Sequence, residues 1–381
     1  MPSWANDGGG AGHARVTDRH FMRAAIAAGQ RCQGTTWPNP SVGCVIVAGG
    51  RIVGQGTTAV GGRPHAETQA LAMAGGAARG ATAYVTLEPC AHHGQTPPCA
   101  EALIAAGIAR VVIGCGDPYA QVNGAGVAKL LAAGIAVSEG VEHQAAAASL
   151  APFLTRVRSG RPFITLKLAA TLDGRIATAG GESQWITGDA ARAQVHAERG
   201  RHDAVMVGGA TARADNPDLT CRLPGFAQRP TVRVVWDTLA RLPLTHGLVS
   251  LAHTTPTWLL HSAAAPAAAL AALQSAGVCL FEIPGEPGAL NPAAALQYLG
   301  DAGLTSVFVE GGGRLAASLL AADLVDRLVW FSAPAVLGAD ALAGIGPLGV
   351  ATLATMPRFR RLAITPVGAD LMAVFERADP A

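Results

Sequence analysis

The chain has 381 residues, of which 50% are apolar and 14% are charged, and a formal net charge of +2. This length suits two domains better than one, and the composition excludes a disordered or fibrous protein. The near-neutral charge gives little support to a nucleic-acid substrate, and no apolar run is long enough for a membrane span or a signal-peptide core. The seven cysteines are an odd number scattered along the chain, which does not suggest a disulfide framework and favours a reducing cytoplasm.

The N-terminal half alternates between helix and strand patterns. Residues 1–14 are polar and glycine-rich, so we expect a flexible tail there. Gly49-Gly50 is a hairpin signal between two short strands. The order of elements predicts a sheet with helices on both faces, a three-layer α/β/α domain. We expect helices over 17–29, 65–74, 99–106 and 127–133, and strands over 42–48, 51–56, 81–87 and 110–115.

The pattern restarts after a Gly/Pro cluster at 159–162. We therefore expect a first domain over 15–158 and a second over 159–381. The second half again alternates between strands and helices, which predicts another α/β domain. We expect strands over 163–169, 204–207, 231–236, 257–260, 278–283, 306–309 and 328–331, helices over 190–199 and 292–300, and a polar loop over 208–217.

Four residues of the first half provide the ligands and the proton carrier of a zinc hydrolytic deaminase. His65-Ala66-Glu67 precedes Pro89-Cys90 and Cys99, so the set offers one imidazole, two thiolates and one carboxylate. Zinc with one nitrogen and two sulfur ligands keeps its fourth position for a water, whose pKa then falls to roughly 7. In zinc deaminases the Glu of H-x-E is not a ligand but moves protons.

The spacing of the two cysteines leaves alternatives open. Eight residues separate Cys90 from Cys99, where the commoner deaminase spacing is two, and they include His92 and His93, which could compete as ligands. A zinc-stabilised binding module without turnover would have no use for Glu67. A deaminase that acts on nucleic acid would use the same ligands, although the near-neutral charge argues against it.

Three segments of this half resemble the bifunctional deaminase–reductase family of riboflavin biosynthesis. They are 39–47 (NPSVGCVIV), 64–67 (PHAE) and 88–99 (EPCAHHGQTPPC), and the eight-residue insert is typical of that family. The resemblance implies a cytidine-deaminase-like fold and a phosphoribosylamino-pyrimidine substrate, deaminated to the corresponding uracil. It further implies zinc ligation by His65, Cys90 and Cys99, proton transfer by Glu67 and a contact of Asn39 with the pyrimidine.

The chain departs from the family pattern in two places. The family usually has a basic residue where Gln95 stands, and Asp-Pro-Asn-Pro where this chain has Asp117-Pro118-Tyr119-Ala120. If the basic residue holds the substrate phosphate, its loss weakens binding rather than chemistry. His92 or His93 could compensate for it.

Four segments of the second half stand out: 167–175, 183–187, 208–222 and 309–315. The last runs from a buried strand through three glycines into a helix. Glycines let backbone N–H groups approach an anion, and a helix start favours negative charge, so this turn could cradle a phosphate, although many such turns are plain connections. It is not G-x-G-x-x-G, and a Rossmann fold is not indicated.

These segments resemble the reductase domain of the same family, which has a dihydrofolate-reductase-like α/β fold and uses NADPH. The planar fork of Arg suits phosphate, although an Arg is more often an ordinary surface charge. The resemblance implies dinucleotide contacts by Ala169, Trp185, Thr211, Asp215, Gly312, Gly313, Arg314, Leu315, Ala316 and Ala317. It implies substrate contacts by Ser183, Arg199, Leu219, Arg222 and Glu310, with Lys167 and Asp173 positioning or polarising the reacting sugar.

We therefore expect a bifunctional enzyme with Zn²⁺ and NADPH as cofactors. It would deaminate 2,5-diamino-6-(5-phosphoribosylamino)pyrimidin-4-one and then reduce the ribosyl group of 5-amino-6-(5-phosphoribosylamino)uracil to the ribityl product. We expect a cytoplasmic homo-oligomer that acts on a small molecule and binds neither nucleic acid nor membrane. The alternatives are a nucleic-acid deaminase and a protein in which only one domain is active.

Overall fold

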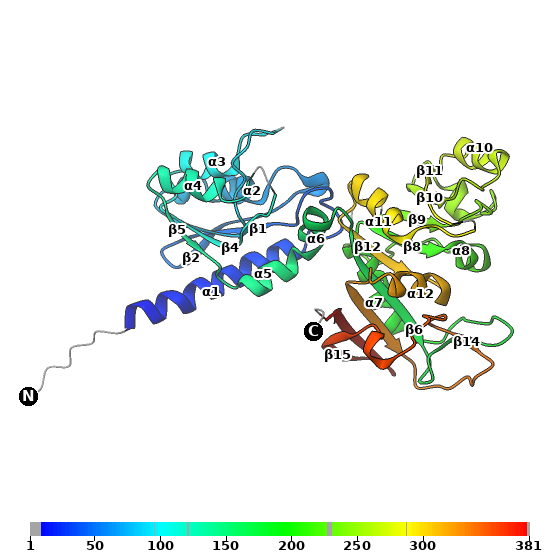
Figure 1. The fold of residues 1–381 in the computed structure, drawn as a ribbon. Coiled ribbons are helices and arrows are strands. Elements are labelled where there is room, and N and C mark those ends of the chain that lie inside the picture. The colour runs from blue at the N-terminus through cyan, green and yellow to red at the C-terminus, as the bar shows by residue number, and fades with distance from the viewer. Residues whose placement is uncertain (1–8, 95, 120–121, 227–230, 287, 379–381) are drawn as a thin grey trace, which may run out of the picture. The chain divides into compact units, whose positions relative to one another are not determined.

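The computed structural model describes residues 9–94, 96–119, 122–226, 231–286 and 288–378 (Figure 1). The chain divides into two compact units, Met1–Ser159 and Gly160–Ala381. Among the described residues, no helix has the length and apolar character needed to cross a membrane.

The N-terminal unit is built on a five-stranded sheet. Its strands follow the order β2-β1-β3-β4-β5, in which β1 is antiparallel to β2 and β3, whereas β3, β4 and β5 run parallel. The central strands are buried along nearly their whole length, as expected of a sheet covered on both faces. The strands are β1 Gly43–Ala48, β2 Arg51–Thr57, β3 Thr82–Leu87, β4 Arg110–Cys115 and β5 Ala136–Glu139.

Helices cover both faces of this sheet (Figure 1), which confirms the predicted three-layer α/β/α architecture. Helices α1 and α5 lie on one face, and α2, α3 and α4 lie on the other. The contact with α1 requires glycine in β1, because a Cβ on Gly43 would lie 1.9 Å from the carbonyl oxygen of Ala25. The helices are α1 Gly9–Gln30, α2 Ala66–Ala74, α3 Cys99–Ala105, α4 Ala125–Ala132, α5 His143–Ser149 and α6 Ala151–Ser159.

The first helix begins earlier than the sequence pattern predicts. We expect a flexible tail over 1–14, but α1 begins at Gly9, so residues 9–14 are helical. Ala11, Ala14 and Arg15 are strong helix formers, and the helix extends through them ahead of Thr17. The rest of the expected tail, residues 1–8, lies outside the described residues.

A polar network ties α1 to the sheet. Asp18 accepts hydrogen bonds from Arg110 Nη1 and Nη2 at 2.9 and 2.7 Å and from Tyr84 Oη at 2.8 Å. Arg110 also donates to Ser138 in β5 at 2.9 Å. Burial works against ionisation of Asp18, but the hydrogen bonds from Arg110 and Tyr84 outweigh it and lower the pKa of this carboxyl. The network fastens α1 to three strands at once.

The C-terminal unit contains a nine-stranded sheet in the order β11-β10-β9-β8-β12-β6-β13-β16-β15. The strands from β11 to β13 are parallel, and the hairpin β15–β16 adds an antiparallel edge. All seven strands expected from the sequence are present, with ends that differ by a single residue. The strands are β6 Phe163–Ala170, β8 Ala204–Gly208, β9 Val232–Trp236, β10 Thr257–His261, β11 Cys279–Glu282, β12 Ser306–Glu310, β13 Arg327–Ser332, β15 Phe359–Val367 and β16 Asp370–Arg377, and β7 Arg175–Ala177 pairs with β14 Leu342–Ala343.

One element of this unit corrects an expectation. The polar loop expected over 208–217 contains helix α8, Gly209–Asp215, because Ala210, Ala212 and Arg213 favour helix strongly enough to outweigh the glycines and Asp215. Both expected helices are present. The helices are α7 Asp189–Arg201, α8, α9 Gly247–Ser250, α10 Ala267–Ser275, α11 Pro292–Asp301 and α12 Gly313–Ala321.

Candidate functional site

Two helix starts and one strand end place the candidate zinc ligands. His65 immediately precedes α2, Cys99 is the first residue of α3, and Cys90 lies shortly after β3. Helix α2 packs directly on β2, since a Cβ on Gly54 would lie 2.2 Å from the carbonyl oxygen of Ala70. This contact between backbones determines where the start of α2, and with it His65, lies relative to the sheet.

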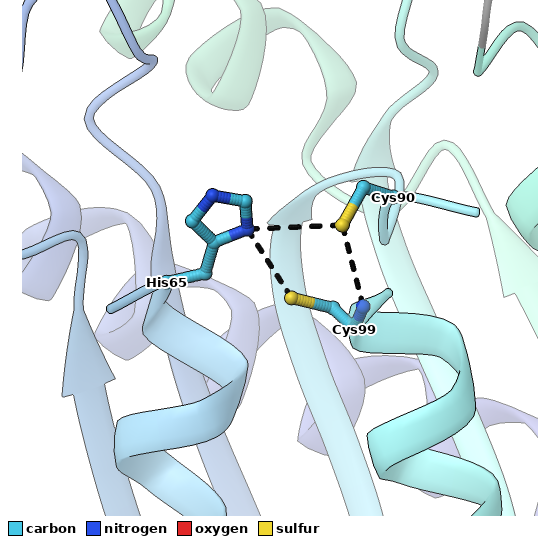
Figure 2. A group of neighbouring side chains, drawn as sticks. All are labelled: His65, Cys90 and Cys99. Carbon is cyan, nitrogen blue, oxygen red and sulfur yellow. Dashed lines mark hydrogen bonds between the residues drawn. The ribbon is translucent and has the colours of Figure 1, made fainter. Parts of the chain in front are cut away.

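The three ligand side chains point toward one another (Figure 2). His65 Nδ1 lies 3.3 Å from Cys99 Sγ and 3.7 Å from Cys90 Sγ. A tetrahedral zinc ion with bonds of about 2.1 Å to nitrogen and 2.3 Å to sulfur would separate such atoms by about 3.6 Å. The group therefore fits zinc, and it is the one metal-binding arrangement of His, Cys, Asp and Glu found among the described residues.

The two cysteines differ in their protonation. The hydrogen bond from the Cys99 thiol, with help from His65, lowers the pKa of Cys90 to about 4 against the effect of burial. The same hydrogen bond, burial and the neighbouring Glu67 raise the pKa of Cys99. The backbone N–H of Cys99 also donates to Cys90 Sγ at 3.3 Å. Without a metal the pair thus favours a thiolate at Cys90 and a thiol at Cys99, whereas a divalent cation would stabilise both thiolates.

Glu67 lies beside this group in the first turn of α2. Its side chain is buried, with 4% of the residue exposed. Burial and the charge of Cys90 raise the pKa of Glu67 to about 6. A carboxyl with a pKa close to the working pH can both accept and release a proton, as a general acid–base catalyst must.

A cavity of about 360 Å³ adjoins the ligands, and His65, Glu67 and Cys90 contribute to its wall. Asn39 lines the same cavity, and its Nδ2 donates to the carbonyl oxygen of Gly62 at 3.0 Å. The volume is that of a small-molecule site. The structure thus brings His65, Glu67, Cys90 and Asn39 together at one cavity, with Cys99 beside His65 and Cys90.

Two further carboxylates, which were not among the residues expected at the site, line this cavity. Glu88 accepts backbone hydrogen bonds from Gly124, Gly126 and Val127 at 3.0 to 3.2 Å, so it fastens the start of α4 beside Cys90. Burial raises the pKa of the other, Asp117, to about 6. Each of these residues follows a buried parallel strand. Their place at the site could have been predicted from that position, because the carboxyl ends of parallel strands meet at one edge of a sheet.

The two histidines of the loop between the cysteines do not belong to the metal group. His93 Nε2 lies 3.3 Å from Glu101 Oε1, and its side chain is exposed. His92 lines the cavity, and its buried Nδ1 has no hydrogen-bond partner among the described residues. Gln95 and Ala120, where the chain departs from the family pattern, lie outside the described residues.

The candidate reductase residues gather at the carboxyl ends of parallel strands. Glu310 ends β12 and is in register with Lys167 in β6. β12 lies between β6 and β8 although it follows both in the chain, so the strand order reverses here. Open α/β sheets bind ligands outside the carboxyl ends of their strands at such a reversal.

Three charged side chains form a cluster at this edge. Arg199 Nε and Nη2 donate to the two carboxylate oxygens of Glu310 at 2.5 and 2.9 Å, and Nη1 donates to the carbonyl oxygen of Thr220 at 3.2 Å. Burial lowers the pKa of Lys167 although Glu310 opposes it. Burial works against ionisation of Glu310, but Arg199 outweighs it and lowers its pKa. A lysine with a lowered pKa is suited to proton transfer.

The triple-glycine segment forms the turn between β12 and α12, in line with the strand–glycine–helix pattern. Gly312 precedes the helix and Gly313 begins it. A Cβ on Gly312 would lie 3.2 Å from Thr211 Oγ1, so Thr211 of α8 lies against this turn. The first N–H groups of a helix have no partner inside it and can bind an anion.

Several residues implied as contacts have their side chains in the core instead. Leu315, Ala316 and Ala317 are 6%, 0% and 7% exposed, and Leu219 is 1% exposed. Any contact that these residues make with a ligand therefore falls to their backbone atoms. Leu219 has a φ of 56°, which is uncommon outside glycine and occurs often at functional sites.

Asp173 is bound within the protein. Its carboxylate accepts hydrogen bonds from Thr171 Oγ1 at 2.5 Å and from the N–H of Gly338 at 2.8 Å. These bonds, Thr171 first, lower the pKa of Asp173 to about 2, so the residue holds the loop at 337–338. The other implied contacts are half-buried or exposed: Ala169, Ser183, Trp185, Asp215, Arg222 and Arg314.

Known proteins match the chain in both units. Residues 15–115 match the cytidine and deoxycytidylate deaminase zinc-binding region, and residues 162–373 match the RibD C-terminal domain. The riboflavin biosynthesis protein RibD of Escherichia coli (strain K12) is 43% identical over an alignment of 367 residues, and the match covers 93% of this chain and 98% of that protein.

Solved structures match over the same extent. Acinetobacter baumannii RibD, form 1, is 37% identical with a TM-score of 0.86, and the match covers 96% of this chain and 100% of that one. A diaminohydroxyphosphoribosylaminopyrimidine deaminase/5-amino-6-(5-phosphoribosylamino)uracil reductase from Thermotoga maritima is 33% identical with a TM-score of 0.83, again over 96% and 100%.

Proposed function

The chain belongs to the RibD family of bifunctional deaminase–reductases of riboflavin biosynthesis, and on that premise we propose that its two units act in sequence on one phosphoribosylated pyrimidine. The first substrate is 2,5-diamino-6-(5-phosphoribosylamino)pyrimidin-4-one, and its deaminated product, 5-amino-6-(5-phosphoribosylamino)uracil, is the second. The observation that carries the proposal is the convergence of His65, Cys90 and Cys99, two of which line one cavity together with buried Glu67.

In the N-terminal unit, His65 Nδ1, Cys90 Sγ and Cys99 Sγ hold zinc, which supplies an activated water when it is bound. Glu67 accepts a proton from the attacking water and delivers it to the pyrimidine ring. Glu67 then moves the second proton of that water to the departing amino group, which leaves as ammonia. The carboxylate is regenerated, and Asn39 orients the pyrimidine at the cavity wall.

In the C-terminal unit, NADPH supplies a hydride when it is bound. The backbone of the glycine turn, together with Thr211, holds its phosphates. Lys167 donates a proton to the ring oxygen of the ribose, whose ring opens as the hydride reaches C1, and the ribityl chain results. The proposed dinucleotide contacts are Ala169, Trp185, Thr211, Asp215, Gly312, Gly313, Arg314, Leu315, Ala316 and Ala317.

The second substrate is held mainly by charged and polar groups. Arg199 is aligned by its two hydrogen bonds to Glu310, and Arg222 pairs with Asp218 at 2.9 Å, so each guanidinium is positioned before a ligand arrives. Asp173 acts indirectly, through the loop that it holds. The proposed substrate contacts are Ser183, Arg199, Leu219, Arg222 and Glu310.

We further propose that the chain forms a homo-oligomer in the cytoplasm. It acts on small molecules alone, with neither nucleic acid nor membrane as a partner. Strand β15 lies at the edge of the nine-stranded sheet, and most of its residues are exposed. Exposed edge strands are able to pair with a second chain. Sedimentation of the purified protein would test the oligomer, since a monomer at micromolar concentration contradicts it.

A coupled assay tests the proposed function directly. The purified zinc-loaded chain is given the diaminopyrimidine substrate without NADPH, and ammonia is measured. NADPH is then added and its absorbance is followed. We expect ammonia in the first step and NADPH oxidation only after it. Ammonia without NADPH oxidation would limit the activity to the N-terminal unit, and deamination of a single-stranded nucleic acid instead would refute the proposal.

A further inference from the structure

Two arginines line the cavity of the N-terminal unit. Arg63 lies two residues before His65, and Arg156 comes from α6. Among the described residues of the lining they are the only lysine or arginine side chains, and an arginine keeps its charge at every physiological pH. The proton transfers at Glu67 use neither of them.

The guanidinium of Arg63 lies against the loop that joins Cys90 to Cys99. Its Nη1 donates to Thr96 Oγ1 at 2.7 Å, and a Cβ on Gly94 would lie 3.4 Å from its Nη2. Thr96 is the one hydrogen-bond partner that the described residues give it. Since a guanidinium has five N–H donors, most of them are left for an acceptor in the cavity.

The remaining charges of the lining are unfavourable to an anion. Glu67, Glu88 and Asp117 all contribute carboxyl groups to the wall. A phosphate monoester carries nearly two negative charges at neutral pH, so it can enter such a cavity only beside a fixed cation. The planar fork of arginine matches the oxygens of a phosphate and binds them in pairs.

We propose that Arg63 binds the phosphate group of the substrate during deamination and is a specificity-determining residue of the N-terminal unit. The inference rests on the proposed function and adds to it the residue that distinguishes a phosphorylated substrate from an unphosphorylated one. The positive charge of Arg63 comes from the segment before His65. Its guanidinium lies against Gly94 and Thr96, the two residues that flank Gln95 in the sequence.

The test compares ammonia release from the substrate with that from the same compound without its phosphate. The full-length zinc-loaded chain is used as wild type and as Arg63→Ala, Arg63→Lys and Arg156→Ala. For Arg63→Ala we expect KM for the phosphorylated compound to rise roughly 10- to 100-fold, with kcat and the KM for the other compound unchanged. Arg63→Lys should recover part of the loss. Arg51→Ala, at an exposed position in β2, is the matched control and should behave as wild type.

Ribose 5-phosphate gives a second readout, because it should compete with the substrate in the wild type and bind about tenfold more weakly to Arg63→Ala. Equal KM increases for both compounds, or a loss of bound zinc, would mean that Arg63 only shapes the loop, and would overturn the proposal. A phosphate-specific loss in Arg156→Ala alone would move the role to α6 and overturn it as well. If the wild type releases no ammonia, the proposed function itself fails.

Discussion

The two candidate active sites are built in different ways. In the N-terminal unit the side chains of His65, Glu67, Cys90 and Cys99 converge and supply both the ligands and the proton carrier. In the C-terminal unit the candidate cofactor cradle over 312–317 offers mainly backbone, because its hydrophobic side chains are buried. The comparison teaches that residue identity is informative where side chains bind, and much less so where backbone N–H groups bind.

Glu67→Gln has the largest expected effect, a loss of activity at the side-chain site of the N-terminal unit alone. An amide cannot carry a proton, so ammonia release should fall about 10²- to 10⁴-fold, while bound zinc and NADPH-dependent reduction of the uracil compound are unchanged. Metal analysis, an ammonia assay and NADPH absorbance measure the three quantities. Full ammonia release would remove Glu67 from the mechanism, and a loss of NADPH oxidation would show that the two sites are not independent.

Glu310→Gln tests the one part of the second site that depends on charged side chains. The change leaves the guanidinium of Arg199 buried without its carboxylate, so we expect the free energy of unfolding to fall by about 2–5 kcal/mol and NADPH oxidation to be lost. Urea unfolding and the two activity assays measure the result. Glu376→Gln, whose ion pair with Arg360 is more exposed, is the control and should change little. An unchanged stability of Glu310→Gln would contradict the buried pair.

Asp18→Asn should lower the stability of the N-terminal unit by about 1–3 kcal/mol at neutral pH, because Arg110 and Tyr84 lose a charged acceptor. The pKa of Asp18 in the folded protein lies below its ordinary value of 3.8, so the folded state binds fewer protons than the unfolded state. Its contribution is therefore complete above the unfolded pKa and is lost as the pH falls through the folded pKa. Urea unfolding at pH 7 and at pH 3 should show a difference between wild type and variant that shrinks at the lower pH. A constant difference would rule out this linkage.

Leu315→Met has the smallest expected effect. It tests most directly whether the cradle over 312–317 binds the cofactor through backbone atoms, in contrast to the side-chain site of the N-terminal unit. The swap conserves volume, so it should cost less than about 1.5 kcal/mol and leave KM for NADPH unchanged. Thr211→Val, at the residue beside Gly312, is the contrast and should raise that KM roughly fivefold through one lost hydrogen bond. A large KM increase for Leu315→Met would show that the cradle does bind through side chains.

What could be predicted from the sequence divides in a similar way, between patterns that are local in the chain and contacts that form only in the folded protein. Eleven strands and the zinc motif could be predicted because their signals are local: apolar runs, a glycine pair at a hairpin and ligands at helix starts. Strands β5, β7, β14, β15 and β16 were not expected. Strand β15 could not be predicted, because a bulge between Arg361 and Ala363 breaks its alternation and Pro366 weakens the strand signal. The roles of Glu88 and Arg63 depend on loops that meet only in the folded chain, and no local pattern reports such a meeting.

The contact of α2 with β2 determines how the first site can evolve or be redesigned. Any side chain larger than glycine at Gly54 or Gly56 would collide with the backbone of α2 and shift His65 and Glu67 away from Cys90. That side of the cavity is closed to variation. The part of the lining that α6 contributes, Phe153, Arg156 and Val157, takes no part in this contact between β2 and α2. New substrates are therefore expected to arise from changes in that part of the lining, with the metal ligands left in place.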